Sequence, residues 1–226
     1  MSDVAEALAV LQFGDSFFPS GAVSFSWGLE GLSDSGVVTD ADAVRAFVIG
    51  QLRARWAEFD RPVVVAAHQV RMSLEEVAAI DARVETQSPC AELRSGSRRM
   101  GEAMLSVFAR LGIGEAAAYR GLVKQGEAFG HLAAMQGYLW GRASLSERNA
   151  IALSAHTFST GLLGAGIRLG CLSHIEAQQI LIEAREEAAS LAALPVPPVG
   201  ELSAYAVEAE IAVMQHVNNS LRVFAN

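Results

Sequence analysis

Cysteine is scarce in this chain, and its two cysteines, Cys90 and Cys171, lie far apart in the sequence. Two isolated thiols exclude a disulfide-stabilised scaffold and a paired Cys-x-x-Cys motif, which favours a reducing compartment. The first residues include acids, Asp3 and Glu6, where a secretory signal needs a basic segment. We therefore expect a cytoplasmic protein.

Positive charge is also limited, because 17 lysines and arginines face 25 acidic residues and leave a net charge of -8. Arg98 and Arg99 form the only adjacent basic pair, and we expect Glu92 and Glu102 to neutralise it along a helix. An acidic chain without a basic cluster does not suit a nucleic-acid backbone or an anionic membrane. The sequence therefore predicts neither as a partner.

Long hydrophobic runs are missing as well. The most apolar region, 158–175, is interrupted by Arg168 and several glycines, so it falls short of the roughly 20 apolar residues that a membrane span needs. Three glycines of this region, Gly161, Gly164 and Gly166, are small enough to allow close helix packing at a cost in helix propensity. We expect this region to form a crowded central helix.

Helical periodicity dominates what is present, and no strand pattern of comparable length competes with it. Helix starts are predicted at Thr39 or Asp40 and at the capping boxes that begin with Ser73, Ser144 and Ser173. The expected helices cover residues 40–59, 63–70, 74–88, 91–111, 126–140, 144–169, 174–194 and 204–222. The sequence predicts an all-α, single-domain bundle of about nine or ten helices over residues 1–226.

Signs of catalytic chemistry are lacking. No Gly-x-x-x-x-Gly-Lys-Ser/Thr string for a nucleotide and no Gly-x-Ser-x-Gly nucleophile motif occurs. The five histidines are scattered, and none has another at the spacing that places two ligands on one helical face. We expect no catalytic residue, no resident metal and no stably bound cofactor.

The segment 11–30 stands apart from the rest because it combines aromatic residues with proline, glycine and serine. Phe17, Phe18, Phe25 and Trp27 must bury apolar surface either against the body of the protein or against a partner. The sequence leaves both outcomes open.

Four stretches match motifs of one known protein family. Residues 15–30 resemble its N-terminal signature, with matches at Pro19, Gly21, Ser24, Ser26, Gly28, Leu29 and Glu30, and departures at Ala22 and Val23. Residues 98–101, Arg-Arg-Met-Gly, resemble a helical motif of the family, and Arg168, Leu169, Leu172 and Gln178 match a later one. The C-terminus keeps His216, Arg222 and Phe224 and departs at Val217 and Ala225. Together these stretches resemble the UreF family of urease accessory proteins.

The resemblance implies a non-enzymatic, all-helical homodimer that binds the accessory protein UreD, also called UreH, and recruits the GTPase UreG to apo-urease. Nickel would pass through this complex in transit. The segments 1–30 and 200–226 are the expected partner-binding regions. The residues expected to contact partners are Phe17, Phe18, Pro19, Gly21, Phe25, Trp27, Glu30, Arg168, Gln178, His216, Arg222 and Phe224.

Several alternatives stay open at this point. Arg168 is either part of a structural ion pair or a cation at an interface, and Glu30 is either near an interface or an exposed charge in a first helix. The chain could also regulate GTP hydrolysis, with Arg168 or Arg222 as an arginine finger. A divergent helical dimerisation module without a role in urease maturation is the remaining alternative.

Overall fold

The computed structural model describes residues 2–19, 25–204, 206–216 and 224. These residues form helices and contain no strand, which confirms the predicted all-α class. The elements are α1 (Asp3–Gly14), α2 (Leu29–Asp34), α3 (Ala41–Gln51), the π-helix η2 (Leu52–Asp60), α4 (Arg61–Gln69), α5 (Leu74–Gln87), α6 (Ala91–Arg110), α7 (Ala116–Gln125), α8 (Leu132–Arg142), α9 (Glu147–Arg168), α10 (His174–Ala192), the short 3-10 helix η3 (Val199–Glu201) and α11 (Val207–His216). Because α3, η2 and α4 follow without a break, the described chain contains ten separate α-helical rods, within the predicted number.

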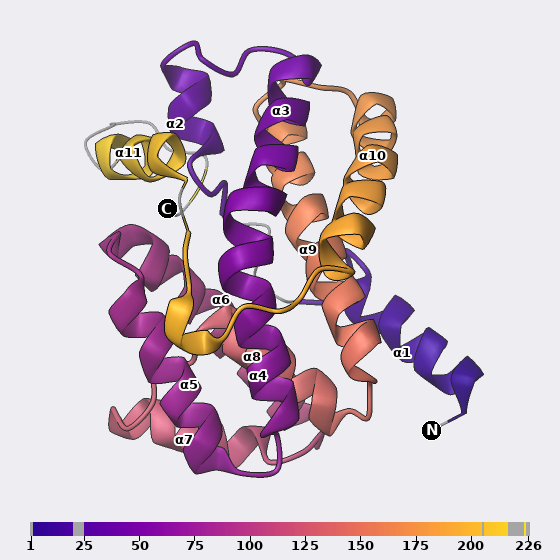
Figure 1. Cartoon of the computed structure of the whole chain (residues 1–226), viewed down its shortest axis with the longest axis vertical. Coiled ribbons are helices and arrows are strands. Elements are labelled where there is room, and N and C mark those ends of the chain that lie inside the picture. Colours follow the sequence, from indigo (N-terminus) through magenta and orange to yellow (C-terminus); the bar gives the residue numbers. More distant parts are fainter. Residues whose placement is uncertain (1, 20–24, 205, 217–223, 225–226) are drawn as a thin grey trace.

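The helices surround two hydrophobic clusters. One lies among α4 to α8 and contains Phe59, Phe108 and Tyr138, and the other lies among α2, α3, α9 and α10 and contains Trp56 and Leu162. The continuous helix of α3, η2 and α4 runs along both, as Figure 1 shows, while α1 projects from the body beside α9. The connection from α10 to α11 crosses the front of the bundle and brings α11 beside α2.

Most helices begin where the sequence predicts. The side chains of Asp40 and Ser73 accept hydrogen bonds from Ala43 and Glu76, and Ser173 forms a complete capping box. Two details differ from the prediction. The backbone N–H of Ser73 donates to Val70, so its capping box is only half formed. The cap of α9 is Ser146, since Ser144 lies in the preceding turn with a φ of 67°.

The helix predicted over 126–140 is wrong in its first part. Residues 116–125 form α7, which ends at Gly126 with a φ of 77°, and α8 begins only at Leu132. Helix α1 was not predicted either, so the segment 11–30 starts inside a helix. The apolar periodicity of 126–140 hid the turn, because the loop from Ala128 to Gly130 is itself buried or half-buried.

The predicted break between residues 59 and 63 does not occur, although Pro62 lies there. Proline has no N–H and normally interrupts a helix. Here the π-helix changes the hydrogen-bond spacing, so that the N–H of Arg61 donates to the carbonyl of Trp56. The two carbonyls that proline leaves free find other donors: the Ala57 carbonyl accepts from Arg61 Nε at 3.3 Å, and the Glu58 carbonyl accepts from the Ser203 N–H at 3.2 Å.

Helix α9 is long and apolar enough to cross a membrane by length and composition, but half of its most apolar window is buried inside the bundle. This burial is that of a core helix. Close packing against its glycines occurs at Gly166, where a Cβ would collide with Leu172. A Cβ at Gly161 or Gly164 would meet nothing within 4 Å, so the crowding predicted for these two positions is wrong.

A fully buried carboxylate, Asp81 of α5, fixes the loop between α7 and α8. Its Oδ2 accepts hydrogen bonds from the N–H groups of Phe129 at 2.8 Å and Gly130 at 2.7 Å, and from the Tyr119 hydroxyl at 2.9 Å. Its Oδ1 accepts from the His131 N–H at 2.8 Å. Burial and the neighbouring Asp81 charge raise the pKa of Tyr119, so that hydroxyl remains a donor.

The buried imidazole of His131 continues this network. Its Nε2 lies 2.8 Å from Glu85 and its Nδ1 lies 3.1 Å from the Ser97 hydroxyl, whose oxygen accepts from the Leu132 N–H at 3.1 Å. Burial lowers the pKa of His131 despite the nearby Asp81 and Glu85 carboxylates. A neutral ring that donates from Nε2 and accepts at Nδ1 satisfies every one of these contacts. The network ties α5, α6 and α8 together.

Candidate functional site

The two motifs that define the family resemblance in the first half of the chain contact each other. Phe25 is buried, and its ring lies against Gly96 of α6, where a Cβ would come within 2.7 Å of it. The Arg99 guanidinium lies over the same ring, with Cζ 5.0 Å from the ring centre. Glycine at position 96 is therefore required for the N-terminal segment to lie against α6.

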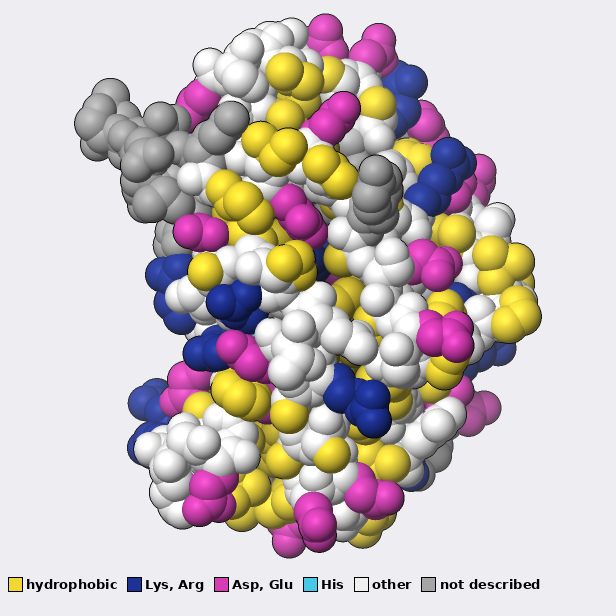
Figure 2. Space-filling view, turned by 60° about the vertical axis from the view of Figure 1, so that its left-hand side comes forward, with side chains coloured by type: hydrophobic (Ala, Val, Ile, Leu, Met, Phe, Trp, Pro, Cys, Tyr) yellow, Lys and Arg dark blue, Asp and Glu magenta, His cyan; other side chains and the backbone are white. Residues whose placement is uncertain are grey.

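Arg98 of α6 does not pair as the sequence suggested. Arg98 donates from Nε to Glu85 of α5 at 2.9 Å rather than to Glu92 or Glu102, and the nearby Arg120 takes Glu102. The Arg98 contact holds the pKa of Glu85 below its usual range. Figure 2 shows Lys and Arg side chains gathered near the left edge of the face that carries α11, although the net charge of the chain is -8.

A left-handed turn leads from Phe25 into α2. Trp27 and Gly28 have φ angles of 54° and 92°, and a non-glycine residue in this region is uncommon. The Trp27 ring lies 6.2 Å from the Phe158 ring of α9, and the Arg55 guanidinium lies over it, with Cζ 4.4 Å from the ring centre. These contacts fix the strained residue and explain why an aromatic side chain can stand there.

Helix α11 packs on the helix that follows this turn. A Cβ at Gly28 would lie 2.5 Å from the carbonyl oxygen of Ala209, and one at Gly31 would lie 2.7 Å from that of Ala212. The backbones of α2 and α11 can approach this closely only because both positions are glycine. The contact joins segments that are almost the whole chain apart.

Glu30 and Phe224 complete this arrangement. Glu30 is only 3% exposed, and its Oε2 accepts a hydrogen bond from the Phe224 N–H at 3.2 Å. The Phe224 ring is buried, and the Arg168 guanidinium lies over it at 4.4 Å. The expectation of an exposed Glu30 is therefore wrong. Within the described part of the chain Arg168 pairs with an aromatic ring and not with a carboxylate, so the structural ion pair is wrong too.

We call this region the terminal junction. It consists of residues 25–34, Arg168, α11 and Phe224. It borders a pair of buried charges that the sequence did not single out, since Arg55 Nε lies 3.2 Å from Asp60 Oδ2 without the alignment of a hydrogen bond. Burial raises the pKa of Asp60, and the Arg55 charge opposes the shift. The five-residue spacing of this pair follows the π-helix, so an α-helical pattern gave no signal for it.

Other predicted partner residues lie elsewhere. Asp15 turns the chain, because its side chain accepts from the Phe17 N–H at 2.6 Å and its carbonyl from the Phe18 N–H at 2.9 Å. Phe17 is 93% exposed as a result. The Phe18 ring packs inward, 5.5 Å from Phe13 and 5.8 Å from Phe108. Of the four aromatic residues, Phe25 is buried, Phe18 and Trp27 are half-buried against the two hydrophobic clusters, and Phe17 is exposed.

Pro19 is exposed next to this turn, and Gln178 is exposed on α10, away from the terminal junction. The predicted residues Gly21 and Arg222 lie outside the described residues, as do Ala22, Val23, Val217 and Ala225. His216 ends α11, and its side chain is likewise not described.

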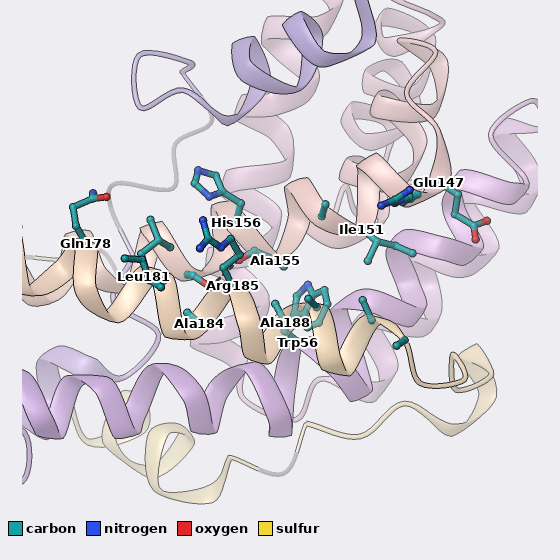
Figure 3. A pocket seen from close by; sticks show the side chains of 17 residues that line it. Trp56, Glu147, Ile151, Ala155, His156, Gln178, Leu181, Ala184, Arg185 and Ala188 are labelled. Carbon is teal, nitrogen blue, oxygen red and sulfur yellow. Dashed lines mark hydrogen bonds between the residues drawn. The ribbon is translucent and has the colours of Figure 1, made fainter. Parts of the chain in front are cut away.

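An apolar groove of about 730 Å³ runs between α9 and α10. Figure 3 shows Ile151 and His156 of α9, Leu181 and Arg185 of α10 and the buried Trp56 around it. Several alanines form much of its remaining lining, which leaves room for bulkier side chains of another chain. We call it the α9–α10 groove.

Among residues 2–19, 25–204, 206–216 and 224, no three His, Cys, Asp or Glu side chains come together as a metal site would require. Cys90 and Cys171 are both buried free thiols. The described chain thus offers contacts between helices and chain ends rather than a cluster of reactive groups.

Comparison with known proteins agrees with this description. A sequence model of the UreF family matches residues 38–185. The chain is 31% identical to a protein of Trichodesmium erythraeum named urease accessory protein UreF, over all of this chain and 99% of that protein. It is 24% identical to proteins of the same name from Yersinia enterocolitica and Yersinia pseudotuberculosis, over 99% of this chain and all of theirs.

The fold and the terminal junction define an all-helical protein whose motif residues serve contacts between its own two ends. The family matches place it among the accessory proteins. The chain belongs to the UreF family of urease accessory proteins.

Proposed function

We propose that this protein is a cytoplasmic urease maturation factor, a chaperone that scaffolds a complex of a UreD/UreH-like protein and the GTPase UreG on apo-urease and so promotes nickel incorporation. Nickel is the cargo of this complex, and the chain itself carries out no catalysis. The observation that carries the proposal is the terminal junction, in which family motif residues from both ends of the chain converge at Glu30, Phe224 and Arg168. We assign the UreD/UreH-like partner to this surface.

Helix α11 is held to the rest of the bundle by few contacts. Its contacts with α2 dominate its packing, and its connection from α10 contains three prolines between residues 195 and 198. Because a partner would meet α2, α11 and Phe224 together, any change that separates them removes the surface without touching the two hydrophobic clusters. The parts of the segments 1–30 and 200–226 that form the terminal junction then act as one binding region.

A pair of glycine substitutions tests this assignment. Gly31→Ala places a Cβ 2.7 Å from the Ala212 carbonyl, whereas Gly164→Ala in α9 meets nothing within 4 Å. We expect Gly31→Ala to abolish copurification with the UreD/UreH-like partner and activation of urease in a nickel-dependent assay, and Gly164→Ala to preserve both. Phe224→Ala, which leaves both helices intact, should behave like Gly31→Ala. Full complex formation by the two junction variants would refute the assignment.

GTP hydrolysis by UreG, measured in the same preparations, separates scaffolding from regulation. Arg168 lies over the Phe224 ring, a position that favours a positioning role within the junction. We expect Arg168→Ala to weaken complex formation in proportion to any loss of GTP hydrolysis. Unchanged binding with a loss of hydrolysis would instead establish the arginine-finger alternative.

We further assign the homodimer contact to the α9–α10 groove and helix α1. The exposed residues Val4, Leu8 and Leu11 form one apolar stripe on α1, which carries the exposed Asp3 and no basic residue. The groove offers a largely apolar lining in which Arg148 and Arg185 outnumber Glu147. This complementarity favours a second copy of α1 as its occupant. Leu8→Glu should give a monomer by light scattering, whereas Val37→Glu, at an exposed position far from both surfaces, should leave the dimer intact.

A further inference from the structure

A polar hollow of about 550 Å³ lies where the connection between α4 and α5 faces the connection between α8 and α9. It is separate from the terminal junction and from the α9–α10 groove, and none of the predicted partner residues lines it. The residues of this hollow that matter here are Glu6, His68, Arg71, Arg142, Ser144 and Ser146. We call it the Arg71–Arg142 hollow.

Arg71 is held in place by its neighbours. Its aliphatic stem crosses Gly141 of α8 so closely that a Cβ there would collide with Arg71 Cδ. Its Nη1 donates a hydrogen bond to the His68 carbonyl at 2.8 Å. The absence of a side chain at position 141 thus seats the arginine and directs its guanidinium into the hollow.

Arg142, the last residue of α8, also rests its side-chain stem against a glycine. A Cβ at Gly114 would lie 2.7 Å from Arg142 Cβ, so the stem rests against a glycine with a φ of 57°. Its Nη1 approaches the sulfur of Met72 at 2.8 Å. A thioether is a weak acceptor, so this contact does little to satisfy a guanidinium.

The charges around the two arginines are not balanced. Neither guanidinium has a carboxylate within 4.0 Å among the residues that the structure describes, whereas Arg53, Arg94 and Arg98 each pair with a glutamate. His68 Nε2 is already bonded to the Leu145 carbonyl at 2.8 Å. Two guanidinium groups with free donors therefore face one hollow.

Glu6 is the acidic residue that lines the hollow, and its carboxylate is already engaged. Its Oε1 accepts from the Ser146 N–H and from Asn149 Nδ2, each at 2.7 Å. These hydrogen bonds lower the pKa of Glu6, so the carboxylate is ionised at neutral pH. The Glu6 carboxylate shows that hydrogen-bond donors on one wall of the hollow already hold a negative charge. The two arginines remain available to bind a second, external anion.

We propose that the Arg71–Arg142 hollow binds an oxyanion of the phosphate class, either free phosphate or the phosphoryl group of a small phosphorylated molecule. Guanidinium groups present planar pairs of donors that match the oxygens of phosphate, and two of them on opposing connections can clamp one group. Occupancy links the connection 70–73 to the connection 143–146 and stabilises the folded chain by an amount that grows with the logarithm of ligand concentration above the dissociation constant. The site is independent of the proposed partner surface.

The test uses the full-length protein and inorganic phosphate at constant ionic strength. We expect the thermal midpoint to rise with the logarithm of phosphate concentration and calorimetry to give a saturable titration. Both should be lost in Arg71→Gln/Arg142→Gln, and each single variant should bind with at least a tenfold weaker dissociation constant. Arg83→Gln/Arg110→Gln carries the same net charge at exposed arginines elsewhere and should bind phosphate like the original chain. Far-UV circular dichroism of each variant establishes that it is folded.

Two further arms decide the remaining outcomes. Glu6→Gln keeps an oxygen for Ser146 and removes the negative charge, so it should bind phosphate several-fold more tightly. A phosphorylated sugar that binds more tightly than phosphate identifies a phosphorylated metabolite as the ligand, and equal affinity identifies free phosphate. Acetate should not compete. Absence of saturable phosphate binding, equal loss in both double variants, or weaker binding by Glu6→Gln overturns the proposal and leaves the urease assignment untouched.

Discussion

Replacement of Asp81 by asparagine tests a fully buried carboxylate that fixes the loop between α7 and α8. Asp81 is fully buried and accepts four hydrogen bonds, three of them from consecutive backbone N–H groups at residues 129–131. Asparagine has the same shape but only one acceptor oxygen. If that oxygen takes the Oδ2 position and keeps three partners, its amide group must face the His131 N–H, and two donors then oppose each other.

The magnitude follows from these contacts. A buried donor without a partner costs about 1–3 kcal/mol, and the three remaining hydrogen bonds lose the strength that a charged acceptor gives. We expect the free energy of unfolding to fall by roughly 3–5 kcal/mol. In a chain of this size, each kcal/mol lowers the thermal midpoint by about 2–4 °C. Tyr119→Phe removes only one of the four donors and should cost about 1 kcal/mol.

Urea denaturation followed by circular dichroism measures the free energy of unfolding of both variants. The slope of this free energy against urea concentration should be the same as in the original chain. A loss smaller than that of Tyr119→Phe would refute the reasoning, because it would show that the carboxylate charge does not hold the loop. A changed slope would indicate that the variant alters the compactness of one state, and the comparison would then rest on hydrogen exchange at residues 129–131.

Three further predictions concern other parts of the bundle. Burial holds the pKa of folded His131 below its ordinary 6.5, so the unfolded chain takes up the proton first. The free energy of unfolding should therefore fall as pH drops below 6.5. His131→Gln should reduce this dependence of stability on pH, as measured by urea titrations. Gly101→Ala would drive a Cβ into the Gly130 carbonyl and should cost about 1–3 kcal/mol by thermal denaturation, whereas Gly164→Ala should stabilise by up to about 1 kcal/mol. Arg61→Met removes the donor that binds the carbonyls of Leu191, Leu194 and Pro195 and should expose residues 193–198 to limited proteolysis, with unchanged cleavage contradicting the role.

Local signals predicted much of the fold. Asp40, Ser73 and Ser173 cap helices as their side-chain chemistry suggests, and Ser88-Pro89 separates α5 from α6 as expected. Local signals failed where distant groups compensate for a local defect. Pro62 does not end the helix because Arg61 and the remote Ser203 supply the donors that proline lacks.

The candidate site could also be predicted only in part from the sequence. The motif residues Phe25, Glu30, Arg168 and Phe224 were all selected from the sequence, but that Glu30 binds the Phe224 backbone and Arg168 covers its ring depends on the tertiary arrangement. Arg55 and Asp60 were missed because their spacing of five residues has meaning only in a π-helix. Phe17 and Phe18 could not be separated, since adjacent residues of like chemistry carry no sign of which one faces the core.

The hydrogen bond between Glu30 and Phe224 spans 194 residues of sequence. A ribosome must therefore synthesise and release the 194 residues that separate these groups before the terminal junction can close, and the entropy of closing so long a loop is offset only when both groups are present. Copies that stop before Phe224 lack the closing residue, however well their helices form. A partner that docks at the junction would thus select molecules in which synthesis has passed Phe224, and the order of synthesis would become a checkpoint for assembly.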